Sequence, residues 1–118
     1  MLVNFSNHSS LYWDKTQREA AWEYGEIVDM PFPQITPNAP NEELQMLAQE
    51  YVQRIMSFAK SQIVTVHIMG EMTFTFIVVS RLKEKGIKCI ASTTERKATY
   101  NSDGTKLSEF SFVQFREY

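Results

Sequence analysis

Residues 63–70 have the sequence IVTVHIMG, and this stretch decides the fold class. Its residues are β-branched and nearly all apolar without clean alternation, a pattern typical of a central parallel strand that is covered on both faces. Adjacent parallel strands need crossover connections, which helices usually supply. We therefore expect an α/β protein with helices on both faces of its sheet.

The segment before this stretch begins with a strand and a helix. Residues 2–5 form a short apolar run and predict the first strand. Asp14 stands three residues before Gln17, the spacing of a capping box, and helix formers follow. Gly25 provides the stop signal.

Residues 26–30 predict a second strand, and the four prolines that follow keep the chain extended. Asn41 is the expected N-cap of a second helix. Apolar residues then recur at three- and four-residue steps on one helical face, at Leu44, Leu47, Ala48, Tyr51, Val52 and Ile55.

The segment after residue 70 completes the pattern. Residues 72–82 are an apolar run that ends in cations and Gly86, which indicates a third helix although the sequence MTFTFIVV favours a strand by propensity. Residues 87–91 predict a fourth strand, and residues 92–96 a loop after it. Residues 98–115 predict an antiparallel hairpin.

These elements predict a single domain over residues 1–118, a Rossmann-like open sheet of four mainly parallel strands flanked by helices, with a C-terminal antiparallel hairpin. In such sheets ligands bind outside the carboxyl ends of the strands, where the strand order reverses. For the order 2-1-3-4 this point lies between the first and third strands. We therefore expect a ligand site in the loops at residues 6–10, 70–75 and 92–96.

The composition limits the classes of function. The net charge of −2 provides no basic field for duplex nucleic acid. A lone cysteine, Cys89, suits a reducing cytoplasm, and no apolar run approaches the ~20 residues of a membrane helix. The first residues do not have the pattern of a signal peptide. We expect a cytoplasmic protein that binds no membrane.

Gly70 and the helix start after it form the first candidate site. Glycine allows close approach of a ligand to the backbone, and the unpaired N–H groups of a helix N-terminus favour phosphate. Thr73 or Thr75 would add a hydroxyl donor. The alternative is that Gly70 only turns the chain and Thr73 only caps the helix.

The segment STTER at residues 92–96 is the second candidate. The planar guanidinium of Arg96 matches phosphate, and Ser92, Thr93 and Thr94 would hold neighbouring oxygens. The alternative is an exposed loop in which Arg96 pairs with Glu95.

Ser6, Asn7 and His8 follow the first strand, where His8 would act as a general base or a phosphate ligand. A turn or cap role is the alternative for His8. We interpret His67 as a hydrogen-bonded core histidine and Cys89 as a packed apolar thiol. These residues lack metal-ligand spacing, so we expect no metal site.

The aromatic run near the C-terminus permits two interpretations. Its rings would stack on nucleic-acid bases, or they would complete the core or form a dimer seam. The second interpretation is favoured, and the rings concerned are Phe110, Phe112, Phe115 and Tyr118.

Several of these segments match the motifs of a known family. Residues 5–8 are similar to a strand followed by Ser-His, and Gly70-Glu71 with Thr75 to a Gly-Asp/Glu segment followed by threonine. Residues 93–96 and 115–118 are similar to a Thr-Thr-x-Arg and a closing Phe-Arg-x-Tyr. On these motifs the chain resembles the small single-domain CRISPR-associated proteins of the CARF superfamily, of the ring nuclease type.

The resemblance implies that a homodimer binds a cyclic oligoadenylate, tetra- or hexa-adenylate, and cleaves it to linear products without a metal or cofactor. This activity switches off type III CRISPR signalling. Arg96 is then the expected charge stabiliser with Thr94 beside it, and His8 or Glu71 the expected proton-transfer group. The alternatives are a non-catalytic sensor of the same ligand and an unrelated nucleotide-binding regulatory protein.

Overall fold

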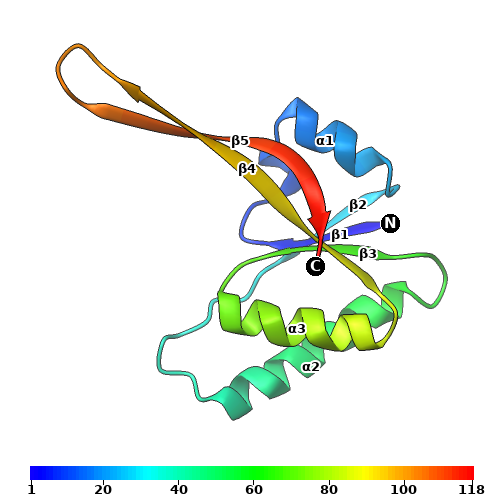
Figure 1. The fold of residues 1–118 in the computed structure, drawn as a ribbon. Helices are drawn as coiled ribbons and strands as arrows, with labels where there is room; N and C mark the ends of the chain where they lie inside the picture. Colours follow the sequence, from blue (N-terminus) through cyan, green and yellow to red (C-terminus); the bar gives the residue numbers. More distant parts are fainter.

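The computed structural model describes residues 1–118, which form five strands and three α-helices (Figure 1). The strands are β1 (Leu2–Ser6), β2 (Ile27–Pro31), β3 (Thr65–Met69), β4 (Lys88–Tyr100) and β5 (Lys106–Glu117). The helices are α1 (Lys15–Trp22), α2 (Asn41–Phe58) and α3 (Met72–Glu84), and a 3-10 turn, η1, spans Ser10–Tyr12. No helix combines the length and hydropathy needed to cross a bilayer.

All five strands belong to one mixed sheet with the order β2-β1-β3-β4-β5. Parallel pairing joins β2, β1, β3 and β4, and β5 runs antiparallel to β4. The α/β class is therefore confirmed, as is the order of the first four strands. The sheet is nevertheless not four mainly parallel strands with a separate hairpin, because β5 is a full member of the same sheet.

The expected loop at residues 92–96 is wrong. Strand β4 continues without a break to Tyr100, and its partners in β5 run from Glu117 back to Lys106. Hydroxyl residues such as Thr93 and Thr94 suit a strand as well as a loop, so a partner strand decides between the two. The only irregularity is a register shift between Thr93 and Thr94.

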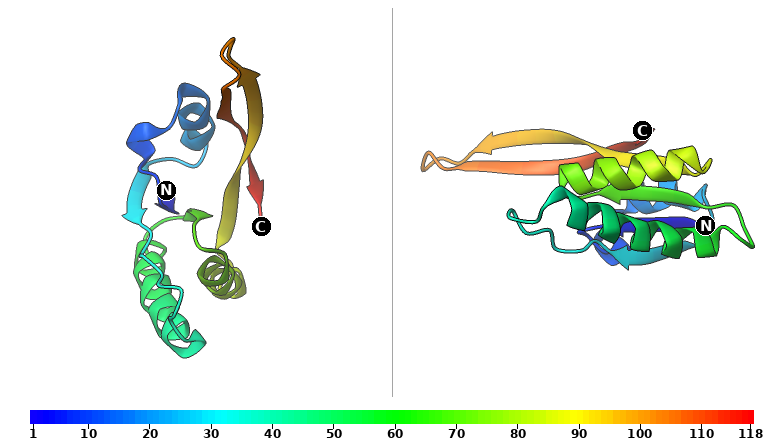
Figure 2. Two further views of the ribbon diagram at one scale, coloured as in Figure 1. Left: turned by 90° about the vertical axis from the view of Figure 1, so that its left-hand side faces the viewer. Right: turned by 90° about the horizontal axis from the view of Figure 1, so that it is seen from below.

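Helices cover both faces of the sheet (Figure 2). On one face α2 and α3 bury the larger core, whose sheet residues include Val3, Phe5, Val66 and Ile68. On the other face α1 and the segment before it cover a smaller core of Leu2, Trp13, Ala21 and Ile90. Side chains alternate between the faces of a strand, so the residues between those of the larger core point toward α1.

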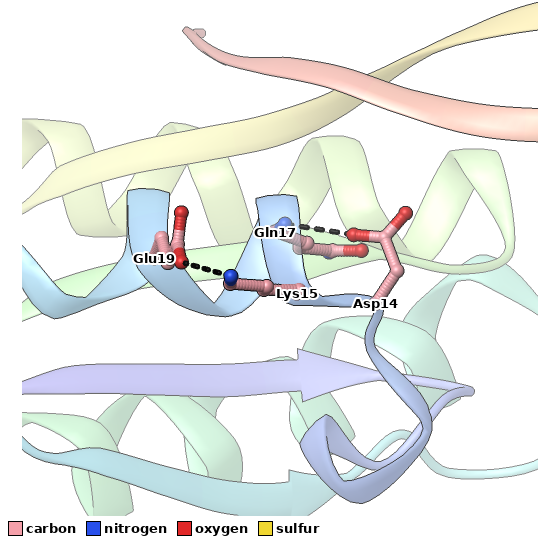
Figure 3. Close-up of polar contacts among 4 residues, drawn as sticks. All are labelled: Asp14, Lys15, Gln17 and Glu19. Carbon is pink, nitrogen blue, oxygen red and sulfur yellow. Dashed lines mark hydrogen bonds and ion pairs between the residues drawn. The ribbon is translucent and has the colours of Figure 1, made fainter.

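Helix α1 begins where the capping-box spacing predicted. The Oδ1 atom of Asp14 accepts a hydrogen bond of 2.8 Å from the backbone N–H of Gln17, and Lys15 pairs with Glu19 at 3.7 Å (Figure 3). This cap satisfies one of the free N–H groups of the first turn. It also fixes the position of Gln17, whose side chain reaches β4.

Helix α2 departs from expectation at its N-cap, and helix α3 begins at Met72 as expected. Pro40, not Asn41, is the N-cap of α2, and no side chain caps it. Helix α3 is confirmed, because Phe74, Val78 and Leu82 recur on one buried face and Arg81 and Lys83 lie in the last turn. Burial of this face outweighs the strand propensity of the sequence.

The ends of β4 and β5 extend as a two-stranded ribbon beyond the body of the protein (Figures 1 and 2). Large apolar side chains on this ribbon are exposed, among them Tyr100 (72%), Phe110 (68%) and Val113 (51%). A lone two-stranded ribbon is marginally stable in water. These side chains are therefore not part of a core within this chain, whereas Phe115 near the base of the ribbon packs against Trp13.

Candidate functional site

A cavity of about 340 Å³, most of whose lining residues are polar, lies at the carboxyl ends of β1 and β3, beside the point where the pairing of β4 with β3 ends. Small-molecule sites typically measure about 300–1,000 Å³, so this cavity is of the right order for one nucleotide unit. None of its lining residues is acidic; they are Ser6, His8, Tyr12, Trp13, Gln17, His67, Met69, Ser92 and Thr94.

A row of polar side chains crosses β2, β1 and β3 beneath this cavity, and Ser92 of β4 lies beside it. Asn4 of β1 is the register partner of Asp29 in β2 and of His67 in β3. Register partners in parallel strands lie side by side on the same face, so all three point toward α1. Ser92 lies two residues beyond Ile90, the register partner of His67, and so faces the same side.

Hydrogen bonds join this row into one chain. The Nδ2 atom of Asn4 donates to Oδ1 of Asp29 and to the carbonyl of His8, both at 2.8 Å. Oδ1 of Asn4 is therefore an acceptor, and it lies 2.9 Å from Nδ1 of His67. This arrangement places the imidazole proton on Nδ1.

The tautomer of His67 determines the role of Ser92. Nε2 of His67 carries no proton and accepts a hydrogen bond of 2.7 Å from the hydroxyl of Ser92. The Nε2 amide of Gln17 donates to the same oxygen at 3.1 Å. The half-buried Ser92 hydroxyl is thus held between a neutral imidazole and a helix side chain at the wall of the cavity.

Burial keeps His67 neutral. The side chain is 2% exposed, with the rings of Trp13 and Phe115 packed against it at 5.4 and 5.5 Å. Removal from water disfavours the imidazolium ion and lowers the pKa of His67 to about 4. His67 is a hydrogen bond acceptor for Ser92 at every pH near neutrality.

Asp29 anchors the other end of the chain. Burial is the largest single effect and raises the pKa of its carboxyl group. Hydrogen bonds from Asn4, Ser10 and Ser9 together lower it by a larger amount, so the pKa lies below its usual value. These bonds measure 2.8 Å from Asn4, 2.9 Å from the Ser10 hydroxyl and 3.2 Å from the Ser9 hydroxyl. Asp29 is thus a fixed anion, fully engaged by neighbouring donors.

A second hollow of about 380 Å³ adjoins the cavity. The two share Ser6, His8 and Tyr12, so together they form one trough along the carboxyl ends of β2, β1 and β3 and the adjacent part of β4. Its remaining lining residues are Asn4, Asn7, Ser9, Asp29, Met30 and Pro31.

Five of the predicted site residues lie in this trough. Ser6, His8, Ser92 and Thr94 line the cavity, and Asn7 lines the adjoining hollow. Ser6, Asn7 and His8 lie there because β1 ends at this edge of the sheet, as the argument from parallel strands predicted. Ser92 and Thr94 reach the same edge within β4, just beyond its pairing with β3.

The segment after β3 lies outside the trough. A Cβ atom on Gly70 would come within 2.4 Å of the Phe32 ring, so packing against that ring requires glycine here. Thr75 is 7% exposed and lines another cavity with Gly70. Glycine at position 70 is therefore explained by packing against Phe32, and Gly70 does not lie in the cavity that Ser92 lines.

The N-terminus of α3 is occupied by the chain's own carboxylate. Glu71 accepts hydrogen bonds from the backbone N–H groups of Phe74 at 2.8 Å and Thr73 at 3.0 Å, and from the Thr73 hydroxyl. The bonds from Phe74 and then from Thr73 lower the pKa of Glu71. Glu71, not Thr73, is the helix cap, and it takes the donors that were expected to bind phosphate.

Arg96 and Thr93 also lie apart from the cavity within one chain. Arg96 is exposed in the ribbon, where its Nη2 atom donates to the Ser108 hydroxyl at 3.1 Å and not to Glu95. The Thr93 hydroxyl bonds to the carbonyl of Gln114 across the register shift at 3.0 Å.

Sequence reasoning missed Asn4, Gln17 and Asp29 as members of the site, and it assigned His67 to the core alone. His67 is indeed buried and hydrogen-bonded, but it also lines the cavity. A signal was present, because polar residues recur every second position in otherwise apolar strands, at Asn4 and Ser6 and again at Thr65 and His67.

Cys89 is buried away from the trough, and burial raises the pKa of its thiol to about 11, as expected for a packed, unreactive group. Nowhere do three or more His, Cys, Asp or Glu side chains gather as ligands for a metal ion.

The profile of the uncharacterized protein MJ1673 family matches residues 1–116. The chain belongs to the MJ1673 family. The match covers all the helices, the strands up to residue 116 of β5, and all the residues of the trough. A comparison with curated protein sequences finds no match.

Proposed function

We propose that this MJ1673 family member binds a cyclic oligoadenylate in the trough and cleaves it to linear products without a metal. The observation that carries the proposal is the trough itself, in which hydroxyl, amide, imidazole and aromatic side chains converge where a parallel sheet binds ligands. The resemblance to ring nucleases of the CARF superfamily supplies the identity of the ligand.

Two aromatic rings suit an adenine base. Tyr12 stands on the rim of the trough with 86% of its surface exposed, and Trp13 lies beside it in the cavity wall. Base stacking on an aromatic side chain is worth about 1–3 kcal/mol. Gln17 and Thr94 add groups that hydrogen-bond to a base or ribose.

The phosphates of a ring require positive charge that the cavity of one chain does not contain. The exposed Arg96 on the ribbon is suited to supply it in a homodimer, with Tyr100, Phe110 and Val113 forming the seam. A two-fold symmetric dimer joins two troughs and matches the symmetry of a cyclic tetra- or hexa-adenylate.

The reaction is an internal transfer within the ligand. A ribose 2′-oxygen attacks the adjacent phosphorus, the bond to the 5′-oxygen breaks, and the leaving oxygen takes up a proton. The products are a linear chain with a 2′,3′-cyclic phosphate and a 5′-hydroxyl. The protein holds the attacking oxygen in line and stabilises the charge on phosphorus. In a cell this activity would switch off type III CRISPR signalling in the cytoplasm.

A binding module without cleavage is the second candidate. Two observations favour it: Glu71 is committed to the cap of α3, and Arg96 lies on the ribbon outside the cavity of its own chain. Such a CARF-type domain would sense or sequester the ring, and the trough would bind it in the same way.

The test is incubation of the wild-type protein with cyclic tetra- and hexa-adenylate in EDTA, followed by chromatography and native gels. We expect linear products from one of the rings. Retention of the ring on a native gel without linear product would identify the binding module, and failure to bind either ring would exclude both candidates.

Variants test the trough directly. Tyr12→Ala should weaken binding by about tenfold or more through lost stacking. Trp22→Ala is the matched control, because Trp22 is an exposed aromatic residue (65%) outside the trough.

Phe110→Lys should yield monomers in analytical ultracentrifugation, whereas Met46→Lys on α2 should leave the dimer intact.

A further inference from the structure

We propose that Ser92 accepts the proton of the attacking hydroxyl and passes its own proton to Nε2 of His67, so that the row Asp29–Asn4–His67 acts behind it as the base of the site. This inference rests on the proposed cleavage function. It replaces the assignment of the base to His8 or Glu71.

The geometry leaves Ser92 one free position for a ligand. Its hydroxyl hydrogen is directed to Nε2 of His67 at 2.7 Å, and one lone pair accepts from Gln17 at 3.1 Å. The second lone pair has no protein partner, and Ser92 lines the cavity. A ligand hydroxyl in the cavity can therefore donate to the oxygen whose own proton is already aligned for transfer.

The proton movement balances with water as the only other participant. As the 2′-oxygen attacks phosphorus, its proton moves to the Ser92 oxygen and the Ser92 proton moves to Nε2 of His67. His67 then carries protons on both nitrogens. When the bond to the 5′-oxygen breaks on the opposite side of phosphorus, that oxygen takes up a proton from water, and His67 later returns its extra proton through Ser92 to water, so the protein regains its initial state.

The rest of the row stabilises the intermediate imidazolium ion. The Nδ1 proton is held by Asn4, whose amide is polarised by the carboxylate of Asp29 at 2.8 Å. Asp29 is the one anion in the row. The tertiary contacts fix this geometry before any ligand arrives, which is the condition for an efficient acceptor.

The groups that face His67 define the pH dependence. Asp29 acts from β2 through Asn4, while β4, β5 and α1 present the uncharged Ser92, Phe115 and Gln17. His8 and Tyr12 also line the cavity. Because burial lowers the pKa of His67 to about 4, cleavage should be independent of pH near neutrality and decline only in acid.

The first test is cleavage of cyclic tetra-adenylate, with binding measured separately. Ser92→Ala should cleave about a hundredfold more slowly, the usual effect of losing a general base, and still bind the ring within about threefold of wild type. Ser92→Thr retains the hydroxyl and should recover a large part of the rate. Ser57→Ala, a serine of α2 on the other face of the sheet, is the matched control.

The second test moves the pKa of His67. The exchange Asn4→Asp with Asp29→Asn keeps the net charge but places the carboxylate directly on Nδ1. A carboxylate favours the imidazolium ion and raises its pKa, so the acid decline of the cleavage rate should move upward by about one pH unit or more. The amide in His67→Gln cannot take a proton, so the residual cleavage rate of this variant should not decline in acid. A purely structural role for the row would not move this profile.

The outcomes separate the two proposals. If the wild type cleaves the ring and Ser92→Ala, folded by circular dichroism, cleaves equally fast, the proton-acceptor role is refuted and the cleavage function stands. The proton-acceptor role is likewise refuted if the exchange variant cleaves with an unchanged pH profile. If the wild type leaves both rings intact, the cleavage function is refuted, and the proton role with it.

Discussion

Acidification should destabilise this fold through one buried side chain, His67. Its pKa is about 4 in the folded protein against an ordinary value of 6.5, because burial disfavours the imidazolium ion. Between these two values the unfolded chain binds the extra proton and the folded chain does not. The stability contributed by the neutral side chain is therefore complete above about pH 6.5 and is lost as the pH falls toward 4.

The magnitude follows from this interval. Each pH unit between the two pKa values removes about 1.4 kcal/mol of unfolding free energy, so the whole interval from 6.5 to about 4 removes about 3 kcal/mol. Asp29 has a lowered pKa, so the stability that its carboxylate contributes is lost only below its ordinary pKa of 3.8, outside the pH interval in which His67 acts. A loss of this size is a large fraction of the stability of a small domain.

The assay is urea unfolding at a series of pH values between about 7.5 and 4.5, for the wild type and for His67→Gln. His67→Gln should be less stable at neutral pH but should lose less stability on acidification, since it carries no proton-binding group at this position. The difference between the two slopes isolates His67. Equal slopes would refute the inference that burial holds this imidazole neutral.

Three further substitutions test the packing that surrounds the site. Gly70→Ala should cost about 1–3 kcal/mol, because the new Cβ atom overlaps the Phe32 ring, and unchanged thermal unfolding would show that the ring moves away freely. Thr75→Val should raise the melting temperature, because the buried hydroxyl has no partner; a lower value would reveal a bond to that hydroxyl. Tyr118→Phe removes the bond of 2.6 Å to the carbonyl of Ile68 and should cost about 1 kcal/mol in urea unfolding, whereas an unchanged midpoint would contradict a role for this bond.

Helix α3 and strand β4 show where local sequence was sufficient and where it was not. The cations Arg81 and Lys83 with Gly86 after them marked the end of α3 despite its strand-like composition. Nothing in residues 92–96 distinguishes a loop from a strand, since serine and threonine are common in both. Pairing with β5 made this segment a strand, and pairing is not encoded within the segment.

The candidate site also contains residues that the sequence located correctly, whereas other predicted residues lie elsewhere. Ser6 and His8 were located from sequence, because the end of a parallel strand is a local property. Ser92 and Thr94 were located from an expected loop that is in fact strand, and they lie at the same edge because the pairing of β4 with β3 ends at Ile90. Arg96 had the right chemistry for phosphate, yet the ribbon places it outside the cavity of its own chain.

By itself the sequence determined the α/β class, the order of the helices and strands and the edge of the sheet at which the trough lies. These follow from hydrophobic periodicity and from caps and stops, which act over a few residues. Only the tertiary structure decided which polar side chains meet. Asp29, Asn4, His67 and Ser92 are far apart in the chain and lie side by side because the register of three parallel pairings aligns them, and register depends on all the strands together.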